Sequence, residues 1–247
     1  MGIGRLIAFV VAGSVTATPV LATPPCAGKP AEAGTVAAVE DGRTLTLSDG
    51  REIRLAGIET PADGQALRAL VEARQLRLEG TGQDRYGRLG AYAYRAGDTE
   101  PVQFALLKAG EARVSARPGG NSCARALLAA EQSARAAGRG LWADPNFAPL
   151  GSQNLTTISA ARGHFALIEG RVLSVRESGA TIYLNFGRRW TRDFSVIIPK
   201  RARGSFAAAG IDTKKFEGRR IRVRGTIEQR RGPIVQAIAP EQIELID

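Results

Sequence analysis

Residues 34–64, "GTVAAVEDGRTLTLSDGREIRLAGIETPADG", hold three short runs in which apolar and polar residues alternate. Asp-Gly pairs at Asp41-Gly42 and Asp49-Gly50 separate the runs, and such pairs favour tight turns between antiparallel strands. Alternation with a period of two is typical of strands that bury one face. This stretch therefore predicts a three-stranded β-meander.

The residues that follow predict a helix, two strands and two further helices. The first helix is indicated by Leu67, Leu70 and Val71, which recur at helical spacing and would face a core. The remaining segments are strands at 76–80 and 90–95, on either side of "TGQDRYGR", and helices at 102–110 and 124–138.

Several linked motifs of this region carry a family resemblance. They are "EDGRTLTL" (40–47), "IRLAGIETP" (53–61), "DRYGRLGAYAY" (84–94), "ALLKAGEA" (105–112) and "SARAAGRGLWAD" (133–144). In this order and at roughly this spacing, over residues 34–145, the chain resembles the staphylococcal nuclease (thermonuclease-like) family. The resemblance implies an OB-fold barrel with packed helices. It also implies, for active members, hydrolysis of DNA and RNA phosphodiesters with calcium.

The resemblance assigns roles to five residues. In active members two carboxylates and a threonine carbonyl hold the ion, a glutamate acts on the attacking water, and two arginines bind the phosphate. Arg54 and Arg88 match the two arginines, whose planar forks suit phosphate oxygens. Thr60 matches the carbonyl donor, Tyr86 is the motif tyrosine, and Glu59 replaces the second metal-binding aspartate.

Two positions depart from the family pattern. The first hairpin reads Asp-Gly-Asp-Thr in the family, whereas this chain has Arg43 at the metal carboxylate. The family glutamate after Thr-Pro is Ala62 here, which has no group to activate water. Because a guanidinium repels a calcium ion, the site is expected to engage a nucleic-acid phosphate through Arg43, Arg54 and Arg88, with weak or no hydrolysis and no cofactor.

An active nuclease with a variant metal site is the alternative, so the enzyme class stays open. In that case Asp41, Glu59 and Thr60 would hold Ca²⁺, Glu59 would act with the two arginines in catalysis, and Asp63 could replace the missing water-activating carboxylate.

The charge distribution points to a second, basic domain. Residues 23–150 contain 16 Lys+Arg against 15 Asp+Glu, whereas residues 151–247 contain 17 against 9. The Pro-, Gly- and Ser-containing segment 146–163 predicts a linker or an ordered connector between domains 23–145 and 164–247. Five strand-like runs and a helix after residue 163 predict a second, smaller OB-like barrel. The expected fold class is thus mainly β with helices (α+β), with two successive barrels.

The second domain also carries candidate nucleic-acid-binding residues. Its motif "RRIRVRG" places Arg220, Arg222 and Arg224 on one face of a strand. The segment "NFGRRWTRD" adds Arg188, Arg189, Trp190 and Arg192. A basic groove with a stacking aromatic residue favours single-stranded DNA or RNA.

Other interpretations of the second domain stay open. The basic face could simply be solvated around a packed tryptophan, or the barrel could bind an acidic protein as a scaffold. His164, the only histidine, is assigned a structural or solvated role.

The N-terminus has the pattern of a secretory signal peptide over residues 1–22, with Arg5 before the apolar run "LIAFVVA" and small residues in "VLA". A membrane anchor is the alternative, but the run is well short of the roughly 20 apolar residues needed to span a bilayer. The mature protein is therefore expected to be periplasmic or secreted, without a membrane span. In such a compartment Cys26 and Cys123, the sole pair, are expected to form a disulfide, with two unpaired thiols as the alternative.

Overall fold

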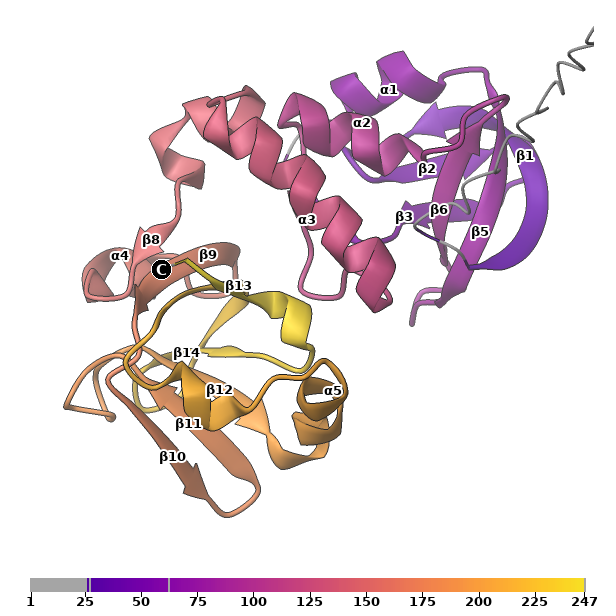
Figure 1. Cartoon of the computed structure of the whole chain (residues 1–247). Coiled ribbons are helices and arrows are strands. Elements are labelled where there is room, and N and C mark those ends of the chain that lie inside the picture. Colours follow the sequence, from indigo (N-terminus) through magenta and orange to yellow (C-terminus); the bar gives the residue numbers. More distant parts are fainter. Residues whose placement is uncertain (1–25, 27, 62, 247) are drawn as a thin grey trace, which may run out of the picture.

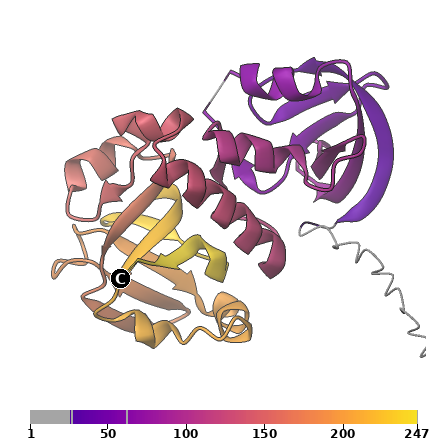
Figure 2. The same ribbon diagram turned by 45° about the horizontal axis from the view of Figure 1, so that its top comes forward.

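The computed structural model describes residues 26, 28–61 and 63–246, and the predicted signal peptide lies outside them. Two β-rich halves, each with its own hydrophobic core, are joined through the long helix α3 (Asn121–Ala136), which lies between them in both views (Figures 1 and 2). Within the described residues, no helix is both long and apolar enough to cross a membrane.

The first half is a closed five-stranded barrel. Its strands are β1 (Lys29–Val39), β2 (Thr44–Leu47), β3 (Glu52–Leu55), β5 (Gln75–Gln83) and β6 (Leu89–Arg95). They follow the order β1-β2-β3-β6-β5, in which only the β3–β6 pair is parallel. The predicted meander and barrel are thereby confirmed.

Local sequence explains the first hairpin. Leu45 and Leu47 on β2 and Ile53 and Leu55 on β3 are buried in the barrel, as the period-two pattern predicts. In the turn between these strands, Gly50 has a φ of 85°, a left-handed conformation that glycine adopts without steric cost.

Helices and short strands lie between and after these barrel strands in the sequence. They are β4 (Ile58–Glu59), α1 (Gln65–Val71), α2 (Val102–Ala109), β7 (Arg113–Val114), η1 (Gly140–Ala143) and η2 (Pro145–Phe147). The predicted disulfide between Cys26 and Cys123 is present, and it ties the segment before β1 to the first turn of α3.

The second half is an eight-stranded sheet. Its elements are β8 (Leu150–Gly151), α4 (Leu155–Ala160), β9 (Phe165–Arg171), β10 (Ser174–Ser178), β11 (Thr181–Asn185), β12 (Ser195–Pro199), η3 (Lys200–Ala202), α5 (Arg203–Ala208), η4 (Thr213–Phe216), β13 (Arg220–Gln229), β14 (Pro233–Gln236), η5 (Pro240–Gln242) and β15 (Ile243–Leu245). The segment predicted as a linker or ordered connector contributes β8 and α4, and Ile158 of α4 belongs to the second core.

The two halves share a strand order. Because only residues 172 and 173 separate β9 from β10, these strands are two parts of one extended segment. The order β10-β11-β12-β14-β13-β9 then returns to the segment from which it started. Its β12–β14 pair is parallel, as is β3–β6 in the first half. The second half therefore has the predicted OB-like order, with β8 and β15 added.

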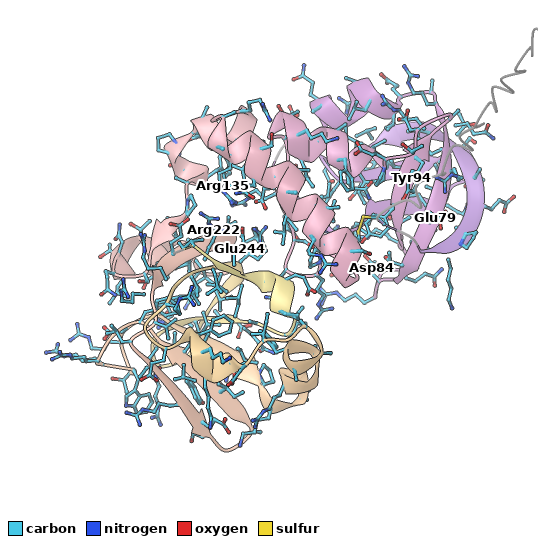
Figure 3. All side chains as sticks on the ribbon, viewed as in Figure 1. Glu79, Asp84, Tyr94, Arg135, Arg222 and Glu244 are labelled. Atoms are coloured by element: carbon cyan, nitrogen blue, oxygen red, sulfur yellow. A yellow bond between two sulfur atoms is a disulfide. The ribbon has the colours of Figure 1, made fainter. Side chains whose placement is uncertain are left out.

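A network of ion pairs fixes the two halves to each other. Arg224 of β13 is fully buried and pairs with Glu131 of α3 at 2.7 Å and with Glu244 of β15 at 2.5 Å. Arg135 of α3 and Arg222 of β13 also pair with Glu244, at 3.5 and 3.3 Å. Figure 3 shows Arg135, Arg222 and Glu244 gathered between α3 and the second half. The outer face of β13 is thus an internal interface.

Candidate nucleic-acid interface

Arg43 and Glu59 form an ion pair at the position where the family resemblance places the metal. The Nη1 atom of Arg43 lies 2.6 Å from a Glu59 carboxylate oxygen and donates a second hydrogen bond, at 3.1 Å, to the carbonyl of Ile58. Arg43 ends the turn before β2, and Glu59 lies on β4. The guanidinium therefore neutralises the carboxylate that a cation would need.

The two carboxylates that could replace the missing ligands of a metal site accept hydrogen bonds from backbone N–H groups instead. Asp41 accepts from the backbone N–H groups of Arg43 and Thr44, at 2.8 and 2.7 Å, and from the Thr44 hydroxyl at 3.1 Å. Asp63 accepts from the N–H of Gln65 at the start of α1, at 3.0 Å. Both side chains stabilise turns, as aspartates commonly do.

Close packing brings the first turn against the threonine of the site. A Cβ at Gly42 would lie 2.1 Å from the Thr60 hydroxyl oxygen, so only glycine allows this approach. The sequence motifs "EDGRT" and "IETP", more than ten residues apart, are in this way held side by side.

Three arginines share the site. Burial, together with the nearby charges of Arg43 and Arg88, lowers the pKa of Arg54, while Glu59 and Asp41 oppose that shift. An anion placed beside Arg54 would relieve the repulsion that Arg54 experiences from Arg43 and Arg88.

Arg88 is oriented by a neighbour on its own turn. Its Nε and Nη2 atoms both lie 2.8 Å from one oxygen of Asp84, which is labelled in Figure 3. The ring of Tyr86 is 67% exposed, with the guanidinium carbons of Arg85 and Arg88 at 4.8 and 5.1 Å from its centroid. Tyr86 is thus available to stack with a base beside the arginines.

These residues do not fit a calcium ion. Calcium takes about six to eight oxygen ligands, several of them carboxylates. Among the residues that the structure describes, no three His, Cys, Asp or Glu side chains come together as a metal site. Glu59 is already paired with Arg43, and the other carboxylates of the region hold turns. Ala62 lies outside the described residues, so its effect on water activation stays a prediction.

The second half presents an exposed aromatic residue among cations. Trp190 is 57% exposed, and the guanidinium of Arg231 lies 5.1 Å from its ring centroid. Arg188, Arg189 and Arg192, also exposed, belong to the same loop between β11 and β12. Arg231 was not among the residues predicted from sequence. The only local signal is the pair Arg230-Arg231 before Gly232, a charged turn between β13 and β14.

The predicted basic face on β13 needs correction. Ile221 and Val223 are buried in the second core, so the predicted alternation is right. The opposite face, however, is covered by α3, which buries Arg224 completely and leaves Arg222 paired with Glu169 and Glu244. Only Arg220 of the three is exposed. Arg224 is therefore a structural residue of the interface and cannot contact nucleic acid in this arrangement.

Comparison with known proteins bears on the first half. Residues 52–144 match the family described as staphylococcal nuclease homologue. No curated protein matches the chain. The match begins after Arg43, so the place of Arg43 in the site rests on its contact with Glu59, which lies within the match. By this match, and by the barrel that carries it, the N-terminal domain of this chain belongs to the staphylococcal nuclease family.

Proposed function

We propose that this chain is an exported nucleic-acid-binding protein whose nuclease-type site engages phosphodiesters with little or no calcium-dependent hydrolysis. The family assignment indicates a nucleic-acid-related function. The Arg43–Glu59 ion pair is the observation that supports little or no calcium-dependent hydrolysis, because it puts a permanent cation at the metal position. The disulfide and the signal-like N-terminus support export.

Phosphate binding follows from the arginines that remain. Arg54 and Arg88 each offer several N–H donors in one plane, and a phosphodiester presents two oxygens that accept them. Asp84 holds Arg88 in one orientation, so little side-chain entropy is lost on binding. Tyr86 adds a stacking surface beside this phosphate position.

The second half supports a preference for single strands. Trp190 is exposed, Arg231 lies over its ring, and exposed arginines occupy the same loop; unpaired bases can stack on such a ring while the cations follow the backbone. We propose that the loops carrying Trp190 and Arg231 form the second contact surface for the same strand.

The test measures binding and cleavage of the same fluorescent single-stranded DNA and RNA, each with calcium and with chelator. We expect binding in both conditions and no cleavage above background. The logarithm of the binding constant should fall linearly with the logarithm of the salt concentration, because neutralised phosphates release counterions. Arg54→Ala should weaken binding about tenfold or more, since it removes charge-assisted hydrogen bonds.

Arg51→Ala is the matched control for Arg54→Ala. Arg51 precedes β3 and pairs with Asp49 of its own turn, so its loss should leave binding nearly unchanged. Equal losses in both variants would mean that general positive charge, and not the site, binds the strand. Calcium-dependent cleavage that disappears in Glu59→Ala would instead identify an active nuclease.

A further inference from the structure

A cavity of about 590 Å³ opens between the two halves beside the Arg43–Glu59 pair. The first half contributes Arg43, Glu59 and Arg113 to its lining, and the second half contributes His164, Phe165 and Thr226. Its volume lies within the range of about 300 to 1,000 Å³ that is usual for small-molecule sites. Neither half alone would form this cavity.

Arg113 is an unusual cation in its wall. Arg113 is only 8% exposed. Its Nε atom is buried and has no hydrogen-bond partner among the described residues. Its Nη2 donates a long bond of 3.4 Å to the carbonyl of Phe165. The rings of Phe147 and Phe165 flank the guanidinium, with their centroids 5.4 and 4.9 Å from its central carbon.

The nearest carboxylate by topology does not neutralise Arg113. Glu59 is its direct partner across the β4–β7 ladder, but the Glu59 carboxylate is engaged by Arg43. Burial lowers the pKa of Arg113, and the negative charges of Glu131 and Glu59 oppose this shift. A buried charge without a close counter-ion is costly, and a bound anion would remove that cost.

We propose that this cavity binds the phosphate group of a nucleotide, with Arg113 as its buried cation and Arg43 and His164 beside it. Two arginines face one carboxylate here, so the lining favours an anion. The apolar remainder of the lining, which includes Phe147, Leu150 and Phe165, suits the nucleoside part.

This inference rests on the proposed function in one respect. A protein that binds nucleic acid would meet nucleotides, either free or at the end of a strand. The nucleotide could be free, or it could be the phosphorylated end of a strand whose next phosphodiesters lie on Arg54 and Arg88. The cavity shares Arg43, Glu59 and Thr60 with the substituted site, so the two positions are continuous.

The experiment titrates the full chain with AMP, adenosine and inorganic phosphate by calorimetry. AMP should bind at least about tenfold more tightly than adenosine and than phosphate, because both the anion and the nucleoside are recognised. A parallel titration compares one oligonucleotide with and without a 5′-phosphate. Tighter binding of the phosphorylated strand identifies a strand end as ligand, and equal binding identifies a free nucleotide.

Four variants separate the cavity from the phosphodiester site. Arg113→Met should weaken AMP binding about tenfold or more, and Arg113→Lys should retain part of it because the charge stays. His164→Ala, at an exposed residue, should weaken AMP binding while leaving the thermal midpoint unchanged, which keeps the test valid if Arg113→Met does not fold. Arg54→Ala should leave AMP binding unchanged but weaken oligonucleotide binding, since Arg54 does not line the cavity.

Three results would overturn the proposal. AMP binding no tighter than that of adenosine would exclude an anion site, and inorganic phosphate as strong as AMP would exclude a nucleotide site. Unchanged AMP affinity in both the His164 and Arg113 variants would also exclude this cavity. If the proposed function alone is wrong, Arg54→Ala loses no oligonucleotide affinity while the AMP results stand.

Discussion

Arg224 of β13 and Glu131 of α3 form an ion pair at 2.7 Å in which both side chains are fully buried. The same guanidinium group donates to the carbonyl of Val114 at 2.9 Å. Arg224 thus links the second half to two elements of the first. Burial raises the pKa of Glu131, and the neighbouring guanidinium of Arg224 opposes this shift.

Removing one partner of this pair should destabilise the whole chain. Arg224→Met leaves the Glu131 carboxylate buried without its counter-ion, which costs about 3 to 5 kcal/mol. Arg224→Met with Glu131→Gln should cost less than the sum of the single changes, because no uncompensated charge remains. Urea unfolding at pH 7 measures these differences.

The control for the buried pair is a surface pair of equal length. Arg95 and Asp98 also lie 2.7 Å apart, but each side chain is about a third exposed. Arg95→Met should cost no more than about 1 kcal/mol. If the Arg224→Met variant were as stable as the Arg95→Met variant, the Arg224–Glu131 pair would not stabilise the interface between the two halves.

The interface should weaken in acid through Glu244. Burial alone would raise the pKa of Glu244, but Arg224, Arg135 and Arg222 hold that pKa below its ordinary value of 4.5. A carboxylate with a depressed folded-state pKa contributes stability that is present above its unfolded pKa and is lost as the pH falls through the folded value.

The parent should therefore lose more stability between pH 6 and pH 3 than Glu244→Gln does. Urea midpoints at several pH values in this window give the comparison. Glu100→Gln, at a half-exposed pair with Lys108, serves as the control and should follow the parent curve. Parallel curves for the parent and Glu244→Gln would rule out this contribution.

Local patterns predicted most of the fold and missed the relation between its halves. The Asp-Gly turns and the alternation around Leu45 and Ile53 correctly give the first hairpins, since both signals lie within a few residues. The alternation on β13 likewise predicts which side chains enter the second core. It does not reveal that α3 covers the outer face, because that contact joins residues 93 positions apart.

The candidate site was predictable only in part for the same reason. Arg43, Arg54, Glu59 and Arg88 could be placed because they lie in recognisable motifs. Arg113 could not, because it lies on a strand of two residues and faces Glu59 through a ladder that no sequence pattern marks. Its burial also depends on Phe165 from the other half.

Stacking on Trp190 should contribute to single-strand binding. Trp190→Ala is expected to weaken binding by about 1 to 3 kcal/mol, because one base loses its stacking partner. The slope of affinity against salt should stay the same, since no phosphate contact is removed. Fluorescence anisotropy at four or more salt concentrations measures both quantities.

Two further variants separate stacking from charge at this surface. Trp190→Phe keeps an aromatic ring and should retain much of the affinity, whereas Arg231→Ala should reduce the salt slope because a cation is lost. An unchanged affinity in Trp190→Ala would remove this residue from the interface.

Arg43 should determine whether the first barrel can hold calcium. Arg43→Asp removes the guanidinium that forms an ion pair with the Glu59 carboxylate. It also adds an oxygen ligand two residues from Asp41. We expect calcium binding to appear with a dissociation constant of about 0.1 to 1 mM, the weak end of calcium sites. Calorimetry with calcium chloride measures it. Arg51→Asp, an equal charge change in the turn before β3, should bind no calcium.

Cleavage should need one more change. Arg43→Asp alone leaves Ala62, which cannot activate water, so its hydrolysis of DNA should stay close to that of the parent. Adding Ala62→Glu should give a modest calcium-dependent activity, because the ion position, a water-activating carboxylate and the Arg54–Arg88 pair would then be present together. The parent decides the matter: if it already cleaves DNA with calcium and Glu59→Ala abolishes the cleavage, then Arg43 does not block the site, and the ion pair must open when the substrate binds.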